Sequence, residues 1–168
     1  GGIPYGAISG RLYMEEPKLI KRFISPIPYE VFIVKHYESR YYTLLRLALV
    51  LPVTVIYTLN PSTIVMLGKR LKTYGAQIVR DIADGAINPP QSLPKEVMDA
   101  IKPFLKPNPQ RARELSRLLE SDQFDARNIW PDLSLISCWT KAAASFYLQV
   151  KTQKGQCLWS DSDGSSED

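Results

Sequence analysis

The sequence predicts an α/β fold in which a partial, mostly parallel sheet is flanked by helices. A dense run of β-branched residues, Val53–Thr58, lies between Pro52 and Asn60, which is typical of a buried strand. A long amphipathic helix is predicted to follow it, and a second apolar run, Leu133–Cys138, is predicted to form another strand. Strands that alternate with helices favour α/β layers with a mostly parallel sheet.

The elements before the first strand are a turn-rich segment and one helix. Residues 1–30 contain four glycines and four prolines, so little regular structure is expected there except a short helix after Pro17. From Tyr41 to Leu51, apolar side chains recur at helical spacing. Pro52 is predicted to end that helix, because proline lacks an N–H group and restricts the residue before it.

The clearest unit in the sequence is the strand followed by a turn and a long helix. Asn60 can cap the helix, and Pro61 suits its first position, where the missing N–H costs nothing. Gly85 is the predicted end of the helix. Between them, apolar residues recur at steps of three and four for about six turns, namely Ile64, Leu67, Leu71, Tyr74, Ile78 and Ile82.

Two further helices are predicted between the strands. Residues 88–109 hold six of the 13 prolines, which leaves room for only a short helix between Pro94 and Lys102. Asn108-Pro109 repeats the combination of a capping residue and proline at a helix start. The arginines of this later helix are expected mainly on a solvated face, and they are Arg111, Arg113 and Arg117.

The last part of the chain divides into a helix and a tail. Trp130-Pro131 marks a turn before the second strand, and Thr140 can cap a final helix that begins with three alanines. Residues 151–168 lose this pattern and are rich in serine and acidic residues, so they are predicted to be a disordered tail. Residues 1–150 are therefore taken as one partial α/β region.

The composition indicates a soluble protein that binds neither nucleic acid nor membranes. The 168 residues carry a net charge of +4, with scattered lysines and arginines that favour a solvated surface over a nucleic-acid site. The most apolar stretch, Leu47–Leu59, is shorter than the ~20 residues that span a bilayer. Two cysteines without CxxC spacing favour a reducing compartment, and the expected location is the cytoplasm.

Most catalytic residue sets are missing from the sequence, and no catalytic or metal-ligating residue is predicted. His36 is the only histidine and no serine sits in a GxSxG motif, so a Ser-His-Asp triad has little support. A lone histidine is usually an ordinary surface or core residue. There is no HExxH motif, cysteine cluster or EF-hand loop, and the glycines near the start fit neither GxxxxGK[ST] nor GxGxxG.

A ligand pocket is instead expected at the carboxyl ends of the two strands, where open α/β sheets bind their ligands. Those ends are Thr58-Leu59-Asn60 and Ser137-Cys138-Trp139. Asn60, Ser62 and Thr63 would place polar groups and free N–H groups there, and a face formed by Tyr42, Leu45 and Leu49 would add an apolar wall. The alternative is that Asn60 only caps its helix and the apolar residues only pack.

Several segments together resemble a bacterial-type member of the Gretchen Hagen 3 family. These are the auxin-responsive acyl-acid amido synthetases, relatives of the acyl-adenylate-forming ligases. The resemblance covers roughly residues 3–150, and its most specific part is the last of the matching segments. In order, they are Tyr42-x-x-Leu45, Val53–Thr58 with Asn60-Pro61-Ser62, Asp81-Ile82-x-Asp84-Gly85, and Trp130-Pro131-x-Leu133-x-Leu135-Ile136-Ser137-Cys138-Trp139-Thr140.

The resemblance implies a fragment of an acyl-adenylate-forming N-terminal domain. The family uses ATP and Mg²⁺ to convert a small carboxylic acid into an acyl-adenylate, and an amine then displaces AMP. It implies that residues 1–150 hold part of the acid-binding region. The phosphate loop rich in serine, threonine and glycine is absent, and Trp139-Thr140 is followed by Lys141-Ala142, where the family has glycine. The implied substrate-binding residues are Tyr42, Leu45, Leu49, Asn60, Ser62, Trp139 and Thr140.

The functional expectation is thus a part of an acyl-acid amido synthetase that retains acid-binding residues and lacks ATP motifs. Two alternatives from other classes stay open, a non-catalytic binding module and a truncated product without function. Self-association through exposed sheet edges is also expected, because two strands leave both outer edges unpaired.

Overall fold

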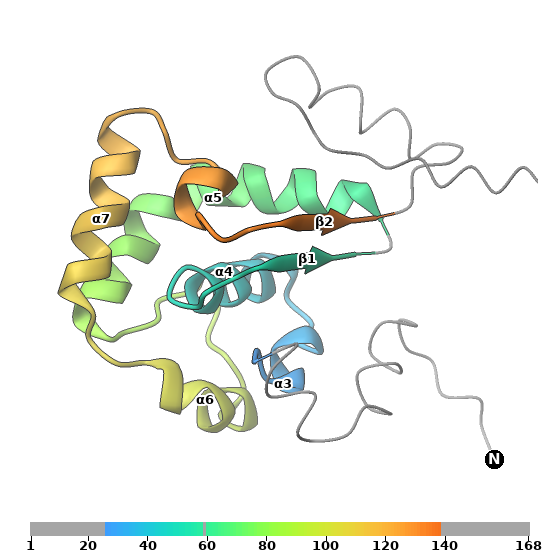
Figure 1. The fold of residues 1–168 in the computed structure, drawn as a ribbon. Coiled ribbons are helices and arrows are strands. Elements are labelled where there is room, and N and C mark those ends of the chain that lie inside the picture. Colours follow the sequence, from blue (N-terminus) through green and yellow to red (C-terminus); the bar gives the residue numbers. More distant parts are fainter. Residues whose placement is uncertain (1–25, 59, 139–168) are drawn as a thin grey trace, which may run out of the picture.

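A computed structural model describes residues 26–58 and 60–138 of the chain. The described part is mostly helical, with one small parallel sheet (Figure 1). In chain order the elements are α3 (Tyr29–Phe32), α4 (Tyr37–Ala48), β1 (Val55–Tyr57), α5 (Pro61–Asp84), α6 (Lys95–Ile101), the 3-10 helix η1 (Lys102–Phe104), α7 (Pro109–Glu120), α8 (Ala126–Ile129) and β2 (Leu135–Ser137).

The predicted α/β class and the parallel pairing of the two strands are confirmed. β1 and β2 pair in parallel, with Val55 opposite Leu135 and Tyr57 opposite Ser137. Each strand is three residues long, shorter than predicted, because only these residues pair in the described sheet. Figure 1 shows the two strands side by side, with α4 and α5 alongside them.

Helix α5 has the bounds that its local sequence predicts. The Asn60 side chain accepts a hydrogen bond from the Ser62 N–H, and Pro61 is the first helical residue. Gly85 ends the helix in the left-handed conformation, with φ of 69°, which residues with a Cβ rarely adopt. A Cβ at this position would lie 2.6 Å from the Pro107 ring. Glycine is therefore needed both for the backbone and for the close approach of Pro107.

The remaining helices follow the prediction in part. α6 and α7 lie where they were expected, and Asn108 caps α7 by accepting from the Arg111 N–H at 3.0 Å. α4 begins at Tyr37 rather than Tyr41, because His36 provides an N-cap that the pattern did not identify. The four-residue helices α3 and α8 were not predicted. The predicted helices after Pro17 and Thr140, and the tail, lie outside the described residues.

One face of the long helices and of the sheet forms the main core. Apolar residues of α4, α5, α7 and α8 are buried together, and Ile56 of β1 packs against them. The buried members are Tyr42, Leu45, Leu49, Leu71, Ile78, Val79, Ile82, Ala112, Leu115, Ile129 and Trp130. A second, smaller cluster joins α3, α4 and α6 through Val31, Val34, Leu47, Val97 and Ile101.

The first strand was predicted to be buried, and the described structure covers only one of its two faces. Val55 and Tyr57 are 50% and 62% exposed, whereas Ile56 between them packs on the core. Successive side chains of a strand point to opposite faces, and the described helices cover only the face that carries Ile56. Leu135 of β2, opposite Val55, is 51% exposed on the same open face.

Candidate functional site

The carboxyl ends of the two strands meet at one edge of the sheet. The Thr58 N–H donates to the Ser137 carbonyl at 2.9 Å, directly after β1. The Thr58 hydroxyl donates to the Asn60 carbonyl at 3.3 Å, which holds the turn into α5. Asn60 and Ser62 therefore lie at the edge where the chain leaves β2. Trp139 and Thr140, which follow Ser137 and Cys138 in sequence, lie outside the described residues.

The sequence predicted free N–H groups at the start of α5, but the N–H groups of Ser62 and Thr63 are already hydrogen-bonded there. The Ser62 N–H donates to the Asn60 side chain at 3.0 Å. The Thr63 N–H donates to the Asn60 carbonyl at 3.0 Å. Because Pro61 has no N–H, the first two N–H donors of this helix belong to Ser62 and Thr63, and Asn60 accepts from both. A ligand at this edge would therefore interact with polar side chains and with the positive end of the helix dipole, rather than with the N–H groups of Ser62 and Thr63.

Tyr42, Leu45 and Leu49 belong to the hydrophobic core. Their side chains are 0%, 3% and 0% exposed, and they pack between α4 and α5. The structure therefore gives each of them a packing role. Their contact with an acid stays a prediction, and it requires a ligand that enters this apolar cluster.

A buried polar network centred on Asp81 holds α4 to the end of α5. Asp81 is 3% exposed and its carboxylate accepts three hydrogen bonds. The Tyr42 hydroxyl donates at 2.6 Å, and the backbone and side-chain N–H groups of Asn88 each donate at 2.7 Å. Burial, and then the hydrogen bond to Asp81, raise the pKa of Tyr42 above its ordinary value. The phenol therefore stays protonated as a donor to a carboxylate.

Arg46 is a fully buried cation beside this network. Its Nε donates to the Ala86 carbonyl at 3.1 Å, and its Nη2 donates to the Asp81 carbonyl at 3.2 Å. Burial lowers the pKa of Arg46, while the charge of Asp81 opposes that shift. Nη1 has no hydrogen-bond partner among the described residues. The guanidinium thus donates to one carbonyl in the last turn of α5 and to one just after the helix, where the helix dipole favours positive charge.

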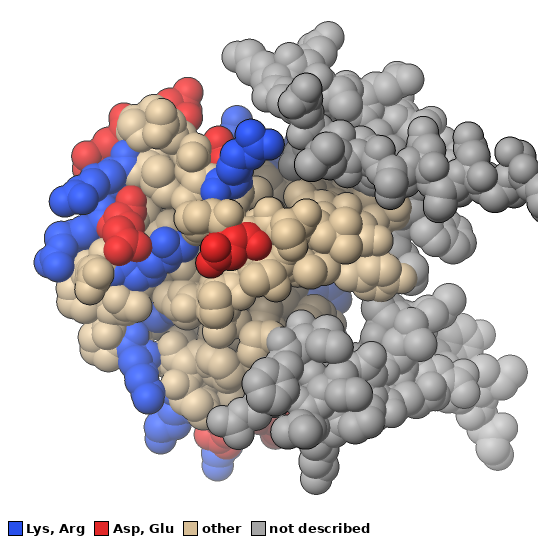
Figure 2. All heavy atoms as spheres, viewed as in Figure 1, with Lys and Arg blue, Asp and Glu red and all other residues tan. Residues whose placement is uncertain are grey.

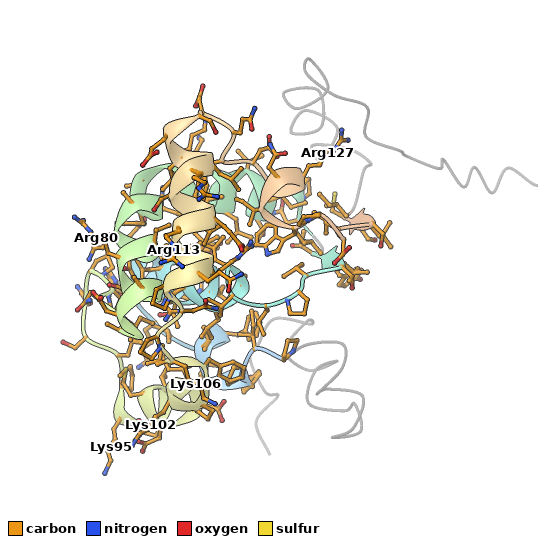
Figure 3. The ribbon with its side chains drawn as sticks, turned by 60° about the vertical axis from the view of Figure 1, so that its left-hand side comes forward. Arg80, Lys95, Lys102, Lys106, Arg113 and Arg127 are labelled. Atoms are coloured by element: carbon orange, nitrogen blue, oxygen red, sulfur yellow. The ribbon has the colours of Figure 1, made fainter. Side chains whose placement is uncertain are left out.

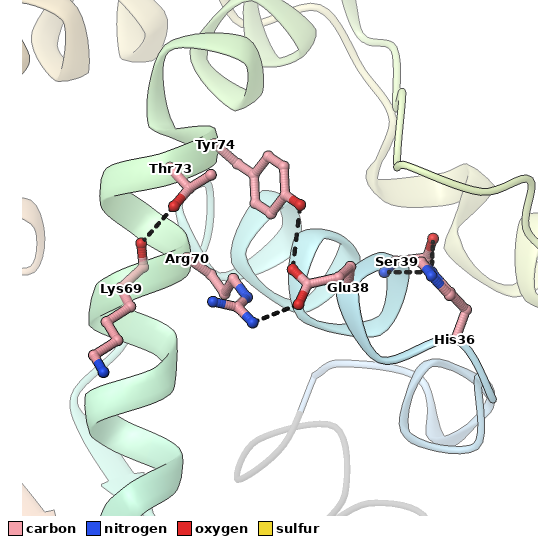
Figure 4. A network of polar contacts seen from close by, with 7 residues as sticks. All are labelled: His36, Glu38, Ser39, Lys69, Arg70, Thr73 and Tyr74. Atoms are coloured by element: carbon pink, nitrogen blue, oxygen red, sulfur yellow. Dashed lines mark hydrogen bonds and ion pairs between the residues drawn. The ribbon is translucent and has the colours of Figure 1, made fainter.

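A second polar network joins α4 to the middle of α5 (Figure 4). Glu38 accepts from Arg70 in an ion pair and from the Tyr74 hydroxyl at 3.2 Å. His36 accepts a hydrogen bond from the Ser39 N–H at 3.2 Å, so the only histidine of the chain caps α4. The expectation that His36 has an ordinary structural role agrees with this contact.

A cavity in the described structure lies at the opposite ends of the strands from the predicted pocket. It has a volume of about 250 Å³ and is lined by Val50, Leu51, Pro52, Val53, Arg111, Ile129, Trp130, Pro131 and Asp132. These residues precede β1 and β2, so the cavity opens at their amino ends. Ligands in open α/β sheets bind at the carboxyl ends. The carboxyl edge is therefore the candidate site, and the amino-end cavity is a competing location for a ligand.

Arg111, which lines this cavity, has a structural role that corrects its predicted place on a solvated face. Its Nε donates to the Leu49 carbonyl at 2.9 Å, and its Nη2 donates to the Ile129 carbonyl at 2.6 Å. Its Nη1 pairs with Glu114 at 3.1 Å. Arg111 thus ties α7 to the ends of α4 and α8. The amphipathic pattern could not predict this, because both carbonyl partners lie far away in sequence.

The charged surface does not mark a single binding site. Figure 2 shows basic and acidic side chains mixed over α5 and α7, while the surface of the strands is mostly uncharged. Six exposed basic residues come from different parts of the chain. In Figure 3, Lys95, Lys102 and Lys106 lie in the lower part of the molecule, and Arg80, Arg113 and Arg127 lie above them, with Arg127 well to one side. In the described part of the chain, no helix is long and apolar enough to cross a bilayer.

These observations define an α/β protein built on a parallel strand–helix–strand unit, with its candidate site at the carboxyl edge. The sequence profile described as "GH3 family N-terminal domain" matches residues 1–153, so the chain belongs to the GH3 family. This confirms the resemblance drawn from the sequence motifs. No curated protein matches the chain.

A solved structure with a similar fold is described as "GH3.15 acyl acid amido synthetase". Its TM-score is 0.64 and its sequence identity is 17%, over 73% of this chain and 22% of that chain. At this identity the likeness shows the fold alone. The chain spans about a fifth of the length of the protein that it matches.

Proposed function

We propose that residues 1–150 form part of the acid-binding region of an ATP-dependent acyl-acid amido synthetase. In this reaction a carboxylic acid is activated as an acyl-adenylate, and an amine then displaces AMP. Support comes from membership of the GH3 family and from the fold shared with an acyl acid amido synthetase. We also propose a cytoplasmic location, on the basis of the cysteine pattern of the sequence.

The observation that carries this proposal is the hydrogen bond between Thr58 and the Ser137 carbonyl. It brings together the two strand ends from which the predicted polar residues follow. Asn60 and Ser62 would face one side of a small acid, and Trp139 and Thr140 the other. An apolar acid needs a mainly apolar pocket with a few oriented polar groups.

The nucleotide and the metal are proposed only for the whole family reaction. Among residues 26–58 and 60–138, no group of three histidine, cysteine, aspartate or glutamate side chains is placed to hold a metal ion.

The acid site can be tested by titrating the ¹⁵N-labelled chain with benzoate, followed by NMR, with benzyl alcohol as a control without a carboxylate. We expect benzoate to shift the amide resonances of Asn60, Ser62 and Thr140, and the Ser62→Ala variant to bind more weakly. The Ser121→Ala variant is the matched control, because Ser121 lies at the far end of α7 and bonds only within its own helix.

Two results would refute the acid-site proposal. The first is a set of benzoate shifts centred on Val50–Val53 and Trp130–Asp132, which would assign binding to the amino-end cavity. The second is the absence of shifts at millimolar benzoate, which would favour a binding module for another partner or a product without function.

The proposed lack of ATP motifs needs a separate test. We expect the purified chain to show no acid-dependent exchange between ATP and pyrophosphate, because adenylation needs positioned phosphates and a metal to offset their charge. Exchange above that of a heat-denatured sample would contradict the proposal that the chain binds the acid without activating it.

We further propose that the chain associates with itself through the outer edges of β1 and β2. Each strand has one partner in the described sheet, so each leaves one row of backbone groups unpaired there. Light scattering of residues 1–168 is expected to give a mass that rises with concentration. A constant monomeric mass would argue against this association.

A further inference from the structure

The open face of the strand pair is an apolar surface that the described helices leave uncovered. Val55, Tyr57 and Leu135 are 50%, 62% and 51% exposed on the side opposite Ile56. Val55 and Leu135 are register partners, so the three side chains form one patch rather than scattered contacts. Figure 2 shows that the surface over β1 and β2 is mostly uncharged. Parallel strands normally have helices on both faces.

The segment that follows β2 carries the pattern of a helix that needs an apolar partner. Ala143, Phe146, Tyr147 and Val150 recur at steps of three and four, which places them on one side of a helix. Polar residues occupy much of the other side, namely Lys141, Ser145 and Gln149, with Leu148 as the exception. Thr140 can cap this helix. Such a one-sided pattern indicates packing against a flat apolar surface.

We infer that residues 141–150 form a helix whose Phe146 side packs on the open face of β1 and β2. Cys138, Trp139 and Thr140 connect this helix to Ser137, which fits the roughly 2–6 residues of a strand-to-helix connection. At about 1.5 Å per residue the helix is about 15 Å long. Each three-residue strand covers about 10 Å. One such helix is therefore long enough to cover the patch.

The segment after β2 is a better occupant of this patch than the alternatives. A segment joined by three residues loses little entropy on docking, because loop-closure cost rises with loop length. Residues 1–25 are rich in glycine and proline and carry no comparable helical pattern. A second copy of the chain would need about 800 Å² per partner for a stable interface, and three partly exposed side chains offer far less. The inference does not depend on the acid-binding proposal.

The test is intramolecular cross-linking in the full chain with Cys138 and Cys157 replaced by serine. One variant carries Tyr57→Cys with Phe146→Cys, and its matched control carries Tyr57→Cys with Ser145→Cys. Neighbouring helical residues point about 100° apart, so only Phe146→Cys should face the strand. We expect a disulfide within one chain to form at least tenfold faster in the first variant. Equal rates, or cross-links only between chains, would overturn the inference.

A second measurement needs no cysteine replacement. Hydroxyl-radical labelling of the unmodified chain should show Tyr57 and Leu135 protected. Phe146→Asp should raise their labelling several-fold by displacing the helix, while Ser145→Asp should leave it unchanged. Strong labelling of Tyr57 and Leu135 in the unmodified chain would refute coverage by residues 141–150, whether or not the chain binds an acid.

Discussion

Replacing Tyr42 by phenylalanine removes one hydrogen bond from the buried network and leaves the ring in place. The Tyr42 hydroxyl is the shortest donor to Asp81, at 2.6 Å, and Tyr42 is fully buried. A hydrogen bond to a charged group contributes about 1.5–3 kcal/mol to stability. For a chain of this size, that loss corresponds to a fall in melting temperature of roughly 3–12 °C.

The matched control for this variant is Tyr74→Phe. Tyr74 packs edge-on against Tyr42 with ring centroids 5.5 Å apart, and it donates to Glu38 at 3.2 Å in a partly exposed position. Removing its hydroxyl should cost at most about 1 kcal/mol. Circular dichroism during thermal and urea unfolding measures both variants. Equal destabilisation by the two substitutions would refute the argument that burial and a charged acceptor make the Tyr42 contact the stronger one.

The same contact predicts a dependence on alkaline pH. Burial and the Asp81 bond raise the pKa of Tyr42, so its stabilising effect is complete below the ordinary value of 10.0. Above that pH the tyrosine of the unfolded chain ionises first, and the stabilisation is lost as pH rises towards the folded-state pKa. Between roughly pH 9 and 11, the wild type should lose more stability than Tyr42→Phe. Parallel losses in the two proteins would assign the effect to other groups.

Three further substitutions test the local geometry, each by its urea unfolding midpoint. Asn60→Ala should cost about 1 kcal/mol by removing the α5 cap, and an unchanged midpoint would show that the cap is dispensable. Gly85→Ala should cost more than the roughly 1–2 kcal/mol of left-handed strain, because its Cβ would also meet Pro107; a smaller loss would mean that this turn relaxes. Arg111→Met should cost about 1–3 kcal/mol by leaving two carbonyls without their donor. Arg113→Met, at an exposed position of the same helix, should change the unfolding midpoint little. Equal losses in the two variants would contradict the stabilising role of the Arg111 hydrogen bonds.

Features decided by neighbouring residues could be predicted from the sequence. The bounds of α5 follow from Asn60-Pro61 and Gly85, because a cap, a proline and a left-handed glycine act within one turn of the helix. The start of α7 at Asn108-Pro109 was predicted for the same reason. The family could also be identified, because its motifs are read along the chain.

The candidate site could be predicted only in part. The sequence identified the strand ends, and the structure joins them through Thr58 and Ser137. The sequence also assigned Tyr42 to a pocket wall, whereas the structure buries it against Asp81. Asp81 was noticed only as part of a motif. Arg46, a lone cation in an apolar run, was the available signal that a buried polar network exists.

The sequence by itself determined where α5 begins and ends, where α7 begins, and which residues alternate between apolar and polar. Only the tertiary structure decided which apolar residues are covered and which cations are buried. Val53–Thr58 is apolar enough for a strand buried on both faces, yet Val55 and Tyr57 are exposed because the described helices pack on one side. Arg111 and Arg113 look alike in the sequence, but only Arg111 meets the Leu49 and Ile129 carbonyls. Caps and turns depend on residues nearby in the chain, whereas burial depends on what distant segments bring alongside.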